Sequence, residues 1–122
     1  MIVKKEIIEE LSYELSLPYT GIEQDWEIEM ANPERIKDFI TFYQNNNLNV
    51  EKKVALMALI LSSYDELLNN SDTIVDEKWN NIKEIIESDK LIFTELIDYW
   101  SLLKETEEKN AFNLTPLMRQ IK

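Results

Sequence analysis

The chain has 122 residues, a length that suits one domain spanning 1–122, and its 44% hydrophobic and 30% charged residues are typical of a globular protein. Its 24 acidic residues against 13 basic ones give a formal net charge of −11, which argues against binding to nucleic-acid phosphates or to an anionic membrane. Because the sequence has no cysteine, no histidine and one glycine, it excludes disulfides, thiolate and histidine metal sites, histidine-activated nucleophiles and glycine-rich phosphate loops, so we expect no enzyme, no cofactor and no metal.

Apolar residues repeat at helical spacing along most of the chain. The spacing predicts six helices, over residues 3–16, 32–44, 49–68, from 71 or 72 onward, 89–103 and 115–121. Two of these begin with a capping residue followed by proline in the first turn, at Asn32-Pro33 and at Thr115-Pro116.

The helix predicted over residues 49–68 contains the longest apolar run. Residues 54–61 are apolar on every side, which indicates a helix surrounded by others. We therefore expect an all-α, single-domain bundle of five or six helices around a central apolar helix at about 50–68.

Residues 25–30 lack the helical spacing. Two sets of residues alternate there, the apolar Trp26, Ile28 and Met30 and the acidic Asp25, Glu27 and Glu29. A period of two predicts an extended strip with its carboxylates outward, or an early helix if the alternation misleads. These carboxylates do not form an EF-hand, because Met30 and Ile36 occupy the positions that need glycine and glutamate.

The acidic residues are unevenly distributed. Residues 6–34 contain nine carboxylates and residues 54–77 contain five, and neither interval has a lysine or arginine. Segregated charge speeds encounter with a basic partner, although acidic residues can also serve only to keep a surface hydrated. The expected partner-binding face consists of Glu23, Asp25, Trp26, Glu27 and Glu29, with Asp65 and Glu66 as a second patch.

Aromatic residues are the usual anchors of protein interfaces, but most of them belong to cores. Trp79 and Trp100 lie on apolar helical faces, so we expect them in the core. Trp26 is the candidate anchor, because two acids flank it, and Tyr19 is expected to be exposed. The chain starts without a signal-peptide pattern and has no apolar run longer than eight residues, so we expect a cytoplasmic protein.

Four segments together resemble a family of small bacterial proteins encoded beside polymorphic toxins. They are residues 23–35 (EQDWEIEMANPER), 54–65 (VALMALILSSYD), 98–100 (DYW) and 112–119 (FNLTPLMR). The resemblance implies an immunity protein of the contact-dependent growth inhibition type, with a cognate toxin of the EndoU-like RNA-cleaving class. It covers most of the chain and assigns no functional residues.

The residues themselves are compatible with this function. Nucleases hold phosphates on a basic surface, which a small acidic protein without catalytic groups can cover. We therefore expect an immunity protein that binds and neutralises a basic toxin. Two alternatives remain: an acidic nucleic-acid mimic, with carboxylates spaced like phosphates, that inhibits a DNA-binding partner, and a helical assembly module with a large apolar patch.

Overall fold

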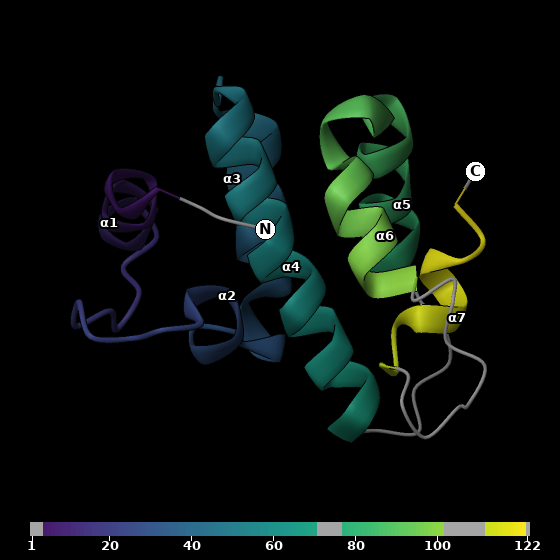
Figure 1. Cartoon of the computed structure of the whole chain (residues 1–122), viewed down its shortest axis with the longest axis horizontal. Coiled ribbons are helices and arrows are strands. Elements are labelled where there is room, and N and C mark those ends of the chain that lie inside the picture. Colours follow the sequence, from purple (N-terminus) through teal and green to yellow (C-terminus); the bar gives the residue numbers. More distant parts are fainter. Residues whose placement is uncertain (1–3, 71–76, 102–111, 122) are drawn as a thin grey trace.

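The computed structural model describes residues 4–70, 77–101 and 112–121, and all regular secondary structure in these ranges is helical (Figure 1). The all-α prediction is confirmed. The elements in chain order are α1 (Lys5–Glu14), α2 (Trp26–Glu29), the 3₁₀ turn η1 (Pro33–Arg35), α3 (Ile36–Asn45), α4 (Val50–Asn70), α5 (Glu77–Ser88), the 3₁₀ turn η2 (Lys90–Phe93), α6 (Thr94–Ser101) and α7 (Thr115–Met118).

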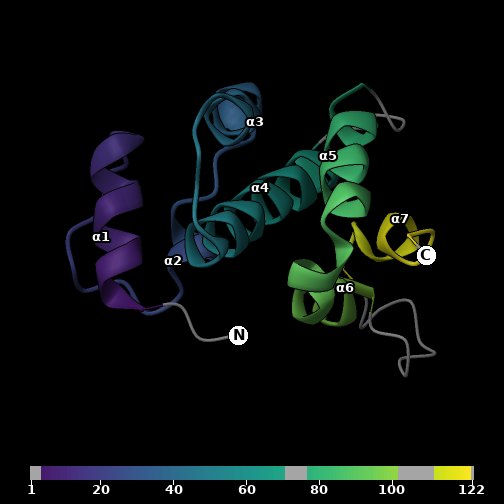
Figure 2. The ribbon, with the colours of Figure 1, turned by 90° about the horizontal axis from the view of Figure 1, so that it is seen from above.

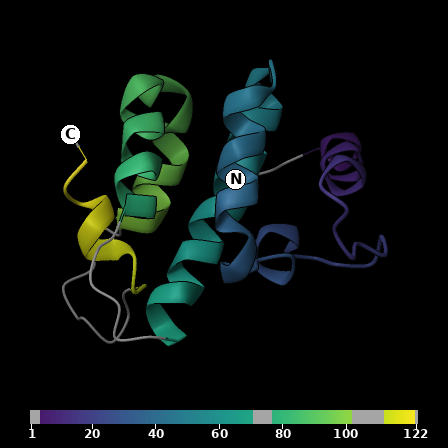
Figure 3. The ribbon, with the colours of Figure 1, turned by 180° about the vertical axis from the view of Figure 1, so that it is seen from behind.

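Helix α4 is the central element, as expected. Residues 55–61 are each at most 2% exposed, because other elements cover this stretch on all sides. Helices α1, α2 and α3 contact α4, and Figure 3 shows α3 lying along its upper part. Helices α1 and α7 lie at opposite ends of the molecule with α4 between them (Figure 2). Of the described helices, none is both long enough and apolar enough to cross a bilayer.

Side-chain caps mark two of the predicted helix starts. The Asn32 Oδ1 atom accepts a hydrogen bond from the Glu34 amide, and the Asn49 Oδ1 atom accepts one from the Lys52 amide. Thr115 differs from the prediction, because its hydroxyl does not cap α7. Instead it donates to the Trp100 carbonyl at 2.7 Å and ties α7 to α6. The predicted start at 71 or 72 and the end at 103 lie outside the described residues.

The core contains both tryptophans that the helical pattern assigned to it. Trp79 is 2% exposed and stacks on Tyr64 with 5.9 Å between ring centroids, and Trp100 is also buried. The prediction for Tyr19 is wrong, because its side chain is partly buried against the core.

The prediction of an extended strip over residues 25–30 is also wrong, and the alternative prediction of an early helix is correct. This segment forms α2, the helix that raises the described total to seven. One helical turn brings residues four apart to the same face, so Trp26 and Met30 are both buried while Ile28 is 54% exposed. The Glu29 carboxylate accepts a hydrogen bond from the Asp25 amide and closes the first turn.

Candidate functional site

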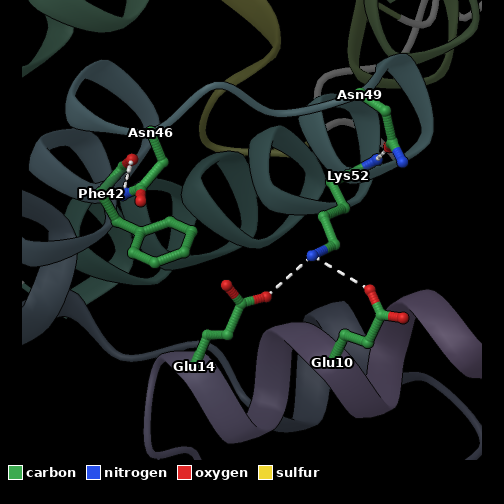
Figure 4. Close-up of polar contacts among 6 residues, drawn as sticks. All are labelled: Glu10, Glu14, Phe42, Asn46, Asn49 and Lys52. Carbon is green, nitrogen blue, oxygen red and sulfur yellow. Dashed lines mark hydrogen bonds and ion pairs between the residues drawn. The ribbon is translucent and has the colours of Figure 1, made fainter.

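Three of the four carboxylates of α1, those of Glu9, Glu10 and Glu14, form ion pairs with described lysines. Lys52 Nζ lies 2.8 Å from Glu14 and 3.0 Å from Glu10. Figure 4 shows the lysine reaching toward both carboxylates of α1. The hydrogen bonds that Lys52 donates to these carboxylates, first to Glu14 and then to Glu10, raise the pKa of Lys52. Two further ion pairs, Lys4–Glu51 and Lys5–Glu9, involve α1 or the residue before it. This side of the acidic run therefore acts mainly to attach α1 to α4.

Three of the predicted contact residues have structural partners. The Glu23 carboxylate accepts hydrogen bonds from the Thr20 hydroxyl and amide, which lower its pKa, and so closes the loop around Gly21. Glu29 holds the first turn of α2. The prediction that Trp26 is an exposed anchor is wrong. Its side chain is 2% exposed, and its indole Nε1 donates a hydrogen bond to Ser12 Oγ at 2.9 Å. Trp26 therefore cannot contact a partner on the surface of this fold.

The other four predicted residues border two adjoining hollows between α2, α4 and α6. The first hollow measures about 220 Å³ and is bordered by Asp25 and Glu27. The second measures about 300 Å³ and is bordered by Asp65 and Glu66. Four residues line both hollows: Ile28, Ser62, Tyr99 and Trp100. We call the two hollows together the acidic cleft.

Carboxylates from both predicted acidic patches affect the pKa of one side chain, Tyr99. Burial raises the pKa of Tyr99, and the negative charges of Glu27, Asp25 and Asp65 raise it further. Within the described part of the chain none of these carboxylates is in an ion pair. The cleft therefore has a negative potential that no lysine or arginine of the described residues cancels through an ion pair.

Asp65 is both a wall of the cleft and a structural acceptor. Burial raises its pKa, while hydrogen bonds from the Leu114 and Asn113 amides oppose that rise. The Leu114 amide lies 2.8 Å from Asp65 Oδ1 and thereby joins the segment before α7 to α4. Its neighbour Glu66 is exposed.

Sequence reasoning missed Ser62 and Tyr99 as parts of the site. Ser62 lines both hollows, and its Oγ atom is buried and has no hydrogen-bond partner among the described residues. Tyr99 is 50% exposed although its helix buries Leu96 and Trp100. The spacing of Leu96 and Trp100, four residues apart, would have placed Tyr99 at the edge of the apolar face, where a side chain can reach both core and solvent.

The carboxylates do not assemble into a metal centre. Across residues 4–70, 77–101 and 112–121, no group of three or more acidic side chains is arranged to hold a metal ion. No protein-family model, curated protein or solved structure matches this chain.

Proposed function

We propose that the protein binds a basic protein partner through the acidic cleft and acts as an immunity protein that neutralises a bacterial toxin in the cytoplasm. The observation that carries this proposal is the convergence of Asp25, Glu27 and Asp65 on Tyr99 without any described cation beside them. The toxin that fits best is an RNA-cleaving nuclease, because such an enzyme needs a basic surface to hold phosphates.

The cleft combines the two properties that fast and lasting capture requires. Unpaired carboxylates attract a basic surface over a distance and raise the association rate. The half-exposed Ile28 and Tyr99 side chains supply apolar contact area, which slows dissociation once water is excluded. Covering the basic active-site surface of a nuclease in this way would block entry of its substrate.

The two alternatives have less support from the described residues. A nucleic-acid mimic needs carboxylates in a row, whereas these acids come from α2 and α4 and surround a hollow. An assembly module needs a large apolar patch. The exposed large apolar residues of the described ranges lie on several different elements, and of these only Ile28 and Tyr99 line a common described hollow.

The first test is whether the gene immediately upstream encodes a large secreted protein with a basic C-terminal domain, and the second is binding to that domain. We expect a stable complex, inhibition of the nuclease activity of that domain and rescue of growth when both are expressed together. The association rate should fall roughly tenfold or more from low to high ionic strength. Failure to form the complex contradicts the proposal, and a rate that is insensitive to salt contradicts electrostatic capture.

A charge-matched pair of variants locates the contact face. The double reversal Asp25→Lys/Glu27→Lys should weaken the complex by about 2–5 kcal/mol, because it opposes like charges at the interface. The control Glu84→Lys/Glu87→Lys changes the net charge equally on exposed positions of α5, away from the cleft. Equal losses in both variants would mean that the cleft is not the contact face.

A further inference from the structure

We infer that the acidic cleft receives one arginine side chain of the protein partner. This inference rests on the proposed function, since it names the chemical group that the same cleft recognises. Three features of the cleft determine the choice: an aromatic wall, a set of carboxylate acceptors, and a buried hydroxyl that lacks a hydrogen-bond partner among the described residues.

The aromatic wall consists of three rings from α6 and the segment before α7. The Trp100 and Phe112 centroids are 4.5 Å apart, and Tyr99 lies 5.4 Å from Trp100 and 5.3 Å from Phe112. Trp100 is buried, whereas half of Tyr99 is exposed, so Tyr99 presents the accessible surface and the other two rings support it. A planar guanidinium stacks on such a surface, and loss of water from the cleft strengthens the contact.

The polar groups around this wall are mainly acceptors. Asp25 and Glu27 border one hollow and Asp65 borders the other. An arginine side chain offers five N–H donors in a fixed plane and no acceptor, so it can satisfy several carboxylates from one position. A lysine ammonium is more strongly hydrated and does not stack as a plane, and therefore fits the same groups less well.

Ser62 gives an independent indication that the cleft takes a polar ligand. The residue is 6% exposed and borders both hollows, and its buried Oγ atom has no hydrogen-bond partner within the described ranges. A buried hydroxyl without a partner is unfavourable, and a ligand N–H that reaches it removes this cost. The carboxylates alone would not distinguish this cleft from a hydrated surface.

The direct test uses the intact protein and N-acetyl-L-arginine methylamide as the probe. Titration followed by NMR should shift the Trp100 indole and Tyr99 ring signals and saturate in the millimolar range, as expected for one side chain. The corresponding citrulline amide has nearly the same shape but no charge, and should give no saturable shift. The lysine amide should bind several-fold more weakly than the arginine amide.

Variants then assign the response to the cleft. Asp25→Asn/Glu27→Gln should weaken arginine-amide binding about tenfold or more, and Ser62→Ala should weaken it a few-fold. The control Glu84→Gln/Glu87→Gln removes the same charge from α5 and should leave binding unchanged. Circular dichroism and thermal unfolding of each variant identify any loss of fold, and Asp25→Asn alone provides a milder variant if the double one unfolds.

Two results overturn the inference: equal responses to the arginine and citrulline amides, or an arginine response that Asp25→Asn/Glu27→Gln leaves intact in a folded protein. The inference and the proposed function can fail separately. If the arginine amide binds the cleft but the upstream-encoded domain does not bind, the arginine site stands and the proposed function fails. If that domain binds the cleft variants with unchanged affinity, the arginine site and the cleft as contact face both fail, whereas neutralisation of the toxin through another face stands.

Discussion

The acids of α1 and those of the cleft have the same charge but different surroundings. Glu10 and Glu14 share one lysine whose side chain is only 18% exposed, and they attach a helix to the core. Asp25 and Glu27 border a hollow and have no ion-pair partner in the described ranges. A count of carboxylates along the chain therefore overstates the acidic surface that is free to meet a partner.

The two groups of acids differ in whether an ion pair offsets their negative charge. Ion pairs on α1 offset the mutual repulsion of its acids. In the cleft no described ion pair offsets the negative charges of Glu27, Asp25 and Asp65, and after burial these charges add to the rise in the pKa of Tyr99. Carboxylates without an ion-pair partner beside an open hollow are typical of a binding surface.

The largest expected effect concerns the core residue that holds the α2 wall of the cleft. Trp26→Ala should destabilise the protein by about 3–5 kcal/mol, because it removes a fully buried indole. Ser12→Ala removes only the acceptor of the Trp26 N–H and should cost about 1–3 kcal/mol. Urea unfolding measures both. A change below 1 kcal/mol for Trp26→Ala would mean that α2 is not held by this side chain.

The second effect concerns Tyr43. Like Ser62, Tyr43 has a buried hydroxyl without a hydrogen-bond partner among the described residues. Burial and the charge of Asp89 raise the pKa of Tyr43 to about 12. Since the ordinary value is 10.0, the folded state holds this proton more tightly than the unfolded state. Stability should therefore fall as the pH rises from 10 to 12, by about 2–3 kcal/mol in total from this group.

Tyr43→Phe should remove this share of the alkaline loss. At neutral pH the variant should be as stable as the original protein or slightly more stable, because a buried hydroxyl without a partner disappears. Denaturant unfolding at several pH values between 8 and 12 checks both statements. Parallel stability curves for the two proteins over this range would show that Tyr43 titrates normally.

A smaller effect is expected at the paired side of the comparison. Lys52→Met should cost about 1 kcal/mol at low salt, because Glu10 and Glu14 then repel each other without a cation between them. Adding Glu10→Gln/Glu14→Gln should restore most of the loss, and high salt should reduce it. If the loss is the same at low and high salt, packing of the lysine stem accounts for it rather than charge.

The smallest effect tests the field in the cleft itself. Asp25→Asn/Glu27→Gln should shift the pKa of Tyr99 down toward its ordinary value, since two of the charges that raise it are removed. The shift should be partial, because burial is the larger cause. Ring-carbon NMR titration of Tyr99 measures it, with Glu84→Gln/Glu87→Gln as the control that leaves the Tyr99 pKa unchanged.

Local patterns in the sequence predicted the parts of the fold that depend on neighbours along the chain. The apolar run of 54–61 indicated the central helix, and the asparagines at 32 and 49 lie at helix starts and cap them. Helix α2 was harder to predict, because periods of two and of four both place Trp26 and Met30 on one side. Only Ile28 distinguishes the two patterns, and it faces outward.

The cleft could not be predicted from such patterns. Asp25 and Asp65 are 40 positions apart, and Tyr99 is 34 positions beyond Asp65, so their convergence depends on how α2, α4 and α6 pack. The same applies to Trp26: its flanking acids suggested an exposed residue, whereas Ser12, on another helix, provides its hydrogen-bond partner. Helical periodicity shows which face is apolar but not which faces meet.

The hydrogen bond from the Leu114 amide to Asp65 has a thermodynamic consequence. Because one carboxylate both holds the C-terminal segment and borders the cleft, anything that stabilises its ionised form strengthens the attachment of that segment. By linkage, detaching the segment changes cation affinity in the cleft by the same factor. The exchange rate of the Leu114 amide hydrogen, which is bonded to Asp65, should therefore change when a cationic group occupies the cleft.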